Sequence, residues 1–69
     1  MSVSNLVRQY VYDQYPNIVH KGDIERQGFE WNVEPSTIDR TCRKLAENGI
    51  LEKCPNNKGH MRYKYITNY

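Results

Sequence analysis

Apolar residues recur at helical spacing in two long segments of the chain. In residues 4–15, the side chains at positions 6, 7, 10 and 11 are apolar and fall on one side of a helix. Pro16 ends this segment, because proline disfavours the helical conformation of the residue before it. Residues 35–48 form the better-marked helix, since Pro35 suits a first helical position and Gly49 follows the last one.

Shorter elements are predicted between these two helices. Ile18 and Val19 are β-branched and indicate a minimal strand. Residues 21–27 predict a second helix, which we expect to end at Gly28. Phe29 and Trp31 follow in a segment too short for another element, and we expect at least one of them to fill the core.

The C-terminal third of the chain predicts a hairpin. Residues 50–54 and 60–67 are separated by Pro, Asn, Asn, Lys and Gly, of which proline, asparagine and glycine accept turn dihedrals cheaply. Met61, Tyr63 and Tyr65 alternate with other residues at the period of a half-buried strand. The pattern therefore predicts an α+β fold, three helices followed by a two-stranded β-hairpin, in one domain over residues 1–69.

Charge changes this picture because it is unevenly distributed. The net charge is only +2 over 69 residues. Residues 1–34 carry three Lys or Arg against five acids, whereas residues 35–69 carry seven against three. The C-terminal half is thus the half expected to face a polyanion, although chance segregation of surface charge explains the same numbers.

Other functional classes find little support in the sequence. The N-terminus lacks a basic region followed by an apolar run, and no stretch approaches the roughly 20 apolar residues of a membrane span. We expect an intracellular, cytoplasmic protein with reduced cysteines. Cys42, between Ile38 and Leu45, is expected in the core. No metal, cofactor, small-molecule ligand or catalytic motif is expected, so we predict that the chain is not an enzyme.

One stretch, Glu34–Lys53, resembles a known superfamily. It combines a hydroxyl pair, a branched apolar residue, an arginine two places later and the pattern Leu-x-x-x-Gly-Ile-Leu. This pattern is similar to the recognition helix and first wing strand of winged helix-turn-helix regulators from prokaryotes and phages. The resemblance implies double-stranded DNA as the partner, with the third helix (35–48) in the major groove and the hairpin wing on the backbone or minor groove.

The resemblance also assigns candidate DNA-binding residues. The helix residues expected to face the groove are Ser36, Thr37, Arg40, Arg43 and Lys44. The wing residues expected to contact DNA are Asn56, Asn57, Lys58, Gly59, His60 and Arg62. A bidentate arginine contact to a guanine edge contributes about 1–3 kcal/mol of discrimination, and Arg40 is the main candidate.

Each assignment has a structural alternative. The alternative for Arg40, less favoured than a DNA contact, is a solvated residue paired with Asp39 or Glu47. Ser36 and Thr37 are equally explicable as helix caps or as phosphate ligands. Lys58 is expected either to contact the DNA backbone or only to keep the hairpin tip charged and soluble. Tyr63 and Tyr65 are expected to pack against the first helix rather than to stack on single-stranded bases.

Alternatives also exist for the function as a whole. A regulator of transcription, replication or recombination from a phage or an archaeon fits the DNA-binding prediction, acting alone, as a homodimer or with a larger protein partner. A winged-helix adaptor that binds proteins is the main rival. It predicts apolar residues on the third helix where this chain has serine, arginine and lysine. Recognition of RNA or of unusual duplexes by the same surface is a further, less favoured, alternative.

Overall fold

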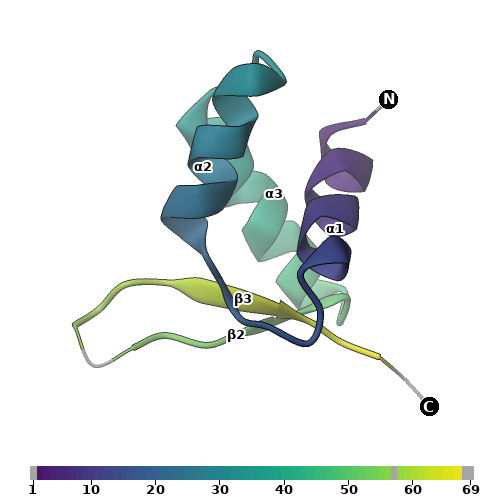
Figure 1. Cartoon of the computed structure of the whole chain (residues 1–69), viewed down its shortest axis with the longest axis vertical. Helices are drawn as coiled ribbons and strands as arrows, with labels where there is room; N and C mark the ends of the chain where they lie inside the picture. Colours follow the sequence, from purple (N-terminus) through teal and green to yellow (C-terminus); the bar gives the residue numbers. More distant parts are fainter. Residues whose placement is uncertain (1, 57, 68–69) are drawn as a thin grey trace.

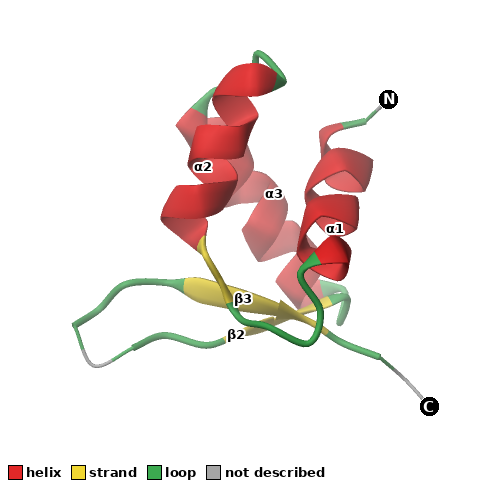
Figure 2. Ribbon diagram, viewed as in Figure 1, coloured by secondary structure: helices red, strands yellow, loops and turns green. Residues whose placement is uncertain are grey.

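The chain folds into three helices and a small antiparallel sheet (Figures 1 and 2). The structure is a computed structural model that describes residues 2–56 and 58–67. The predicted α+β class and the predicted order of elements are confirmed. The elements are α1 (Val3–Asp13), β1 (Val19–His20), α2 (Lys21–Glu30), α3 (Pro35–Glu47), β2 (Leu51–Lys53) and β3 (Arg62–Tyr65).

Local sequence signals set most helix boundaries. The Ser2 hydroxyl caps α1 by accepting a hydrogen bond from the Asn5 amide at 3.2 Å. Pro35 is the first residue of α3, as predicted. Gly49 follows α3 with a φ of +78°, in the left-handed region where glycine is favoured. These signals explain why α1 and α3 lie within about two residues of their predicted positions.

Gly28 does not end α2, and this prediction was wrong. It lies buried inside α2, which continues to Glu30. A Cβ atom built on Gly28 would lie 3.0 Å from Ile38 Cγ1 and 3.1 Å from the Val33 carbonyl oxygen. The glycine therefore leaves room for the close approach of α2 to α3 and to the turn before it, where a Cβ atom would be tightly packed. The residue with positive φ after this helix is instead Asn32, at +59°.

The sheet has three strands, not the two of the predicted hairpin fold. β3 lies in the centre, with β2 on one side and β1 on the other, all antiparallel. Val19 faces Tyr63 across the β1–β3 pair, so the minimal strand predicted around Val19 joins the sheet. The β2–β3 hairpin projects beyond the helices in Figure 1. Its ladder continues past the strands through the Cys54 amide, which donates to the Arg62 carbonyl at 2.8 Å.

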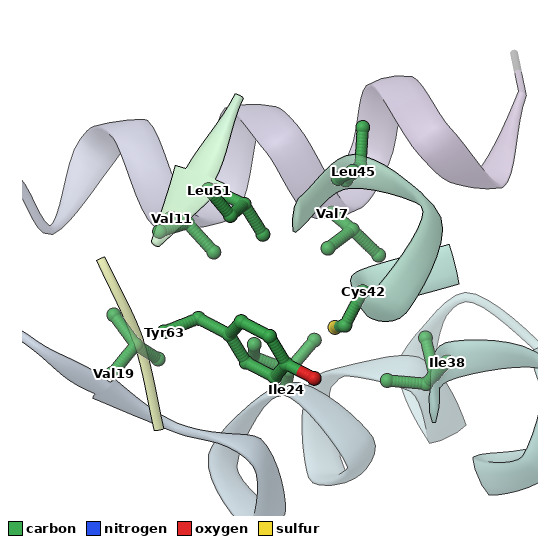
Figure 3. Close-up of a cluster of buried hydrophobic side chains, with 9 residues drawn as sticks. All are labelled: Val7, Val11, Val19, Ile24, Ile38, Cys42, Leu45, Leu51 and Tyr63. Carbon is green, nitrogen blue, oxygen red and sulfur yellow. The ribbon is translucent and has the colours of Figure 1, made fainter. Parts of the chain in front are cut away.

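The core lies between the sheet and the three helices (Figure 3). Tyr63 is the largest fully buried side chain in residues 2–56 and 58–67, and Cys42 is buried as predicted. Phe29 is 64% exposed, whereas Trp31 packs on the core, so only the tryptophan fulfils the expected role. Among the described residues, the core consists of Val7, Val11, Val19, Ile24, Ile38, Cys42, Leu45, Leu51 and Tyr63.

The expected packing of the strand tyrosines on α1 is confirmed. Tyr65 packs edge-on against Tyr12 of α1, with ring centroids 5.0 Å apart. Tyr63 is 1% exposed and lies beside Val7 and Val11 of α1 in the core. A fully buried ring cannot stack on a nucleic-acid base, so the single-strand alternative loses the support of Tyr63.

Candidate nucleic-acid interface

The outer face of α3 is polar and carries three of the candidate cations. Ile38, Cys42 and Leu45 face the core, and this fixes the opposite side of the helix towards solvent. Among the predicted groove residues only Thr37 is half-buried. The others are exposed: Ser36, Arg40, Arg43 and Lys44.

The start of α3 does not use its hydroxyl residues as caps. Glu34 occupies the capping position and makes no side-chain cap hydrogen bond, so Ser36 and Thr37 lie within the first turn. The capping alternative for these two residues is therefore wrong. Their hydroxyls lie at the positive end of the helix dipole, where anions are favoured.

An ion-pair network connects α3 to the beginning of α2. The two carboxylate oxygens of Asp39 are shared between two cations: Oδ1 lies 3.2 Å from Lys21 Nζ, and Oδ2 lies 2.9 Å from Arg43 Nη2. Arg43 is thus partly engaged within the protein. Within residues 2–56 and 58–67 Arg40 forms no ion pair, so the alternative that Asp39 or Glu47 neutralises it is not realised.

Sequence reasoning missed Lys21. Lys21 is the first residue of α2 and lies 18 positions before its partner Asp39. Nothing in its local sequence distinguishes it from any other surface lysine. Its position depends on how α2 lies against α3, which pack closely at Gly28. A pairing of this kind becomes visible only in three dimensions.

The hairpin residues differ in how far they are free to bind. Lys58 and His60 are exposed at the tip, where their amides donate to Asn56 Oδ1, both at 2.9 Å. Arg62 is half-buried, and its Nε donates to the Cys54 carbonyl at 2.9 Å, so it also braces the hairpin. The predicted contact at Asn57 lies outside the described residues.

A hollow of about 530 Å³ joins the hairpin to the start of α2. Its walls include His20, Lys21 and Arg26 on one side and Gly59 and His60 on the other. Lys21 therefore lies between the hairpin tip and Arg43 of α3. We define the basic face as Lys21 together with the α3 cations and the hairpin cations, that is Lys21, Arg40, Arg43, Lys44, Lys58 and Arg62. Arg26, which also lines the hollow, is paired with Asp23 and is not counted.

Acidic groups interrupt the basic face at two places on α3. Glu47 shares a shallow hollow with Arg40, Arg43 and Lys44. Asp39 lies at the edge of the face and is 32% exposed. The basic face is positive but interrupted by acids. This charge pattern suits a polyanion bound in one orientation rather than one attracted without orientation.

The buried thiol and phenol are unsuited to chemistry. Burial, with a smaller contribution from Asp39, raises the pKa of Cys42 to about 12. Burial likewise raises the pKa of Tyr63 to about 12. A nucleophile needs a lowered pKa and access to a substrate, and neither group has them. Nor does the described part of the chain bring together three or more His, Cys, Asp or Glu side chains as metal ligands.

None of the helices in the described residues has the length and apolar character needed to cross a membrane. Comparisons with known proteins do not assign the chain, because no family model, curated protein or solved structure matches it significantly.

Proposed function

We propose that this chain is a winged-helix domain that binds double-stranded DNA selectively. The outer face of α3 enters the major groove, and the β2–β3 hairpin lies on the backbone or minor groove as a wing. One observation carries the proposal: α3 exposes three cations and packs against β2 of a projecting hairpin that has a lysine near its tip. The element order and the β1–β3–β2 sheet also fit a winged helix.

The contacts divide into two kinds. Arg40 is exposed and has no ion pair in the described residues, so its guanidinium is free for a bidentate contact to guanine. Ser36, at the first turn of α3, and Lys58, at the hairpin tip, suit phosphate contacts that set register rather than read sequence. Affinity then comes from counterion release and selectivity from a few base contacts.

The first test is binding to a labelled random-sequence duplex, measured by fluorescence anisotropy over a salt series. We expect log K to fall linearly with log salt, with a slope of about −0.9 for each phosphate contact. A preferred site is then selected from a random library. Absence of binding even at low salt would overturn the proposal.

Three variants, each of which removes one positive charge, test which residues contact DNA. Arg40→Ala is expected to weaken the preferred site more than random DNA, by about 1–3 kcal/mol of discrimination. Lys58→Ala is expected to weaken both about equally. The matched control is Arg8→Ala, because Arg8 is exposed on α1 beside Tyr12 and Tyr65 and away from the basic face. An equal loss from all three variants would contradict the assignment.

A protein-interaction module is the second candidate, and the exposed ring of Phe29 favours it. Phe29 lines a shallow hollow with Val33 and Pro35 at the α2–α3 turn, outside the basic face. A photo-cross-linker at position 29, compared with one at position 40, separates the two functions. DNA adducts from position 40 support DNA binding, whereas protein adducts from position 29, with none to DNA, support an adaptor.

A further inference from the structure

Asp39 occupies an unusual place for an acid beside a surface meant for DNA. It is half-buried on α3, next to the outward-facing stripe that contains Arg43, and each of its oxygens contacts a different cation. The Oδ1 partner, Lys21, comes from α2, and the Oδ2 partner, Arg43, comes from the next turn of α3. An unpaired carboxylate here would repel phosphates, but this one is neutralised by two cations.

The pair with Asp39 restrains Arg43 before any ligand arrives. Arg43 is 60% exposed, and its contact with Asp39 engages Nη2, which leaves the other N–H groups of a five-donor guanidinium available. The acid precedes the base by four residues, which is the favourable order on a helix. A long side chain that is already ordered loses less entropy when it binds, and its preferred geometry discriminates better between partners.

We propose that Asp39 is a positioning residue for sequence selectivity: it holds Arg43 in the orientation that contacts a base edge, and it lowers general affinity for DNA in doing so. This inference rests on the proposed DNA binding. Lys21 completes the arrangement by fixing the other carboxylate oxygen to α2, so that Asp39 cannot follow Arg43 freely. Selectivity at α3 thus depends on a contact between two helices.

The alternative is that Asp39 acts only through its charge. The chain offers a matched control for this, because Glu47 is a second acid on the same face of α3 and forms no ion pair in the described residues. Asp39→Asn and Glu47→Gln each remove one negative charge at nearly constant shape. Affinities of both variants for the selected site and for random duplex are measured in the salt series, after thermal melting shows that each variant is folded.

The two explanations predict different ratios of selected-site affinity to random-duplex affinity. Glu47→Gln is expected to raise affinity for both duplexes by about threefold, the scale of one exposed charge interaction, with an unchanged ratio. Asp39→Asn is expected to raise affinity for random DNA similarly, but to lower the ratio of selected-site to random affinity by about fivefold or more, the low end of one bidentate contact. Equal behaviour of the two variants would overturn the inference while leaving DNA binding intact.

A double-mutant cycle identifies the residue through which Asp39 acts. In an Arg43→Ala background, Asp39→Asn is expected to leave the ratio unchanged, because there is no guanidinium left to position. A fall in the ratio that persists there would overturn the inference. NMR of the free protein gives an independent reading: the Arg43 Nε–H signal should show restricted motion that Asp39→Asn releases and Glu47→Gln does not. If the unaltered protein binds no duplex at all, the proposed function fails first, and the inference with it.

Discussion

Adding a single methyl group at Gly28 tests how closely α2 and α3 pack. The Cβ atom of alanine at this position would lie 3.0 and 3.2 Å from the Cγ1 and Cδ1 atoms of Ile38. It would also lie 3.1 Å from the carbonyl oxygen of Val33, whose amide donates to the Gly28 carbonyl at 2.8 Å. The isoleucine is fully buried and the carbonyl belongs to a hydrogen-bonded turn, so neither can move away cheaply.

The expected magnitude follows from two opposing effects. Overpacking a well-filled core costs about 1–3 kcal/mol, and a contact with a backbone oxygen places Gly28→Ala in the upper half of that range. Alanine is preferred over glycine inside a helix by about 1 kcal/mol, which opposes the loss. We therefore expect a net destabilisation of about 1 kcal/mol or more. In a domain of this size that lowers the melting temperature by about 4–8 °C.

The same helix supplies the control. A Cβ atom on Gly22 of α2 would meet nothing within 4 Å, so Gly22→Ala receives the helix preference without the clash. The assay is thermal unfolding of both variants, followed by far-UV circular dichroism. Gly22→Ala should raise the melting temperature and Gly28→Ala should lower it. An increase of similar size in both would refute the close packing of α2 on the turn and on α3.

Three further predictions follow from single side chains. Ser2→Ala removes the cap on the Asn5 amide and should cost about 0.5–2 kcal/mol in a denaturant melt. Burial raises the folded-state pKa of Cys42 from 9.0 and of Tyr63 from 10.0, each to about 12. The folded state therefore favours the protonated forms, and this contribution to stability is complete below pH 9 and is lost as the pH rises towards 12. Cys42→Ala should move the onset of this loss, measured by denaturant melts, from about pH 9 to about pH 10. In the native protein a thiol reagent should modify the half-buried Cys54 long before Cys42, and equal rates would contradict the buried position of Cys42.

The helices could be predicted because their signals are local. Pro35 and Gly49 act through their own dihedral preferences, which do not depend on the rest of the fold. Gly28 was misassigned because glycine has two uses: it permits positive φ, and it permits close approach. Only the position of Ile38 on the neighbouring helix shows that the second use applies here. The choice between Trp31 and Phe29 likewise depends on contacts with other elements, so the sequence could not show that Trp31 packs on the core.

The candidate site was predictable in its residue types but not in its connections. Helical periodicity placed Arg40 and Lys44 on the solvent side, and both are exposed. The partners of Asp39 and the bracing hydrogen bond of Arg62 depend on contacts between elements, for which the chain carries no local signal. The sequence therefore did not indicate that Arg43 and Arg62 are partly engaged within the protein, and it did not indicate Lys21.

The basic face also sets an upper limit on electrostatic binding by one copy of the chain. It carries six Lys or Arg side chains, of which Arg62 also braces the hairpin and two share the Asp39 carboxylate. At about −0.9 per phosphate contact, one copy should give a salt slope no steeper than about −5. A slope near twice that value on a selected site would mean that two copies bind together, and sedimentation of the complex would then show two chains per duplex. A steep slope with a single chain per duplex would show instead that cations outside the basic face contact DNA, and the interface would have to be redrawn.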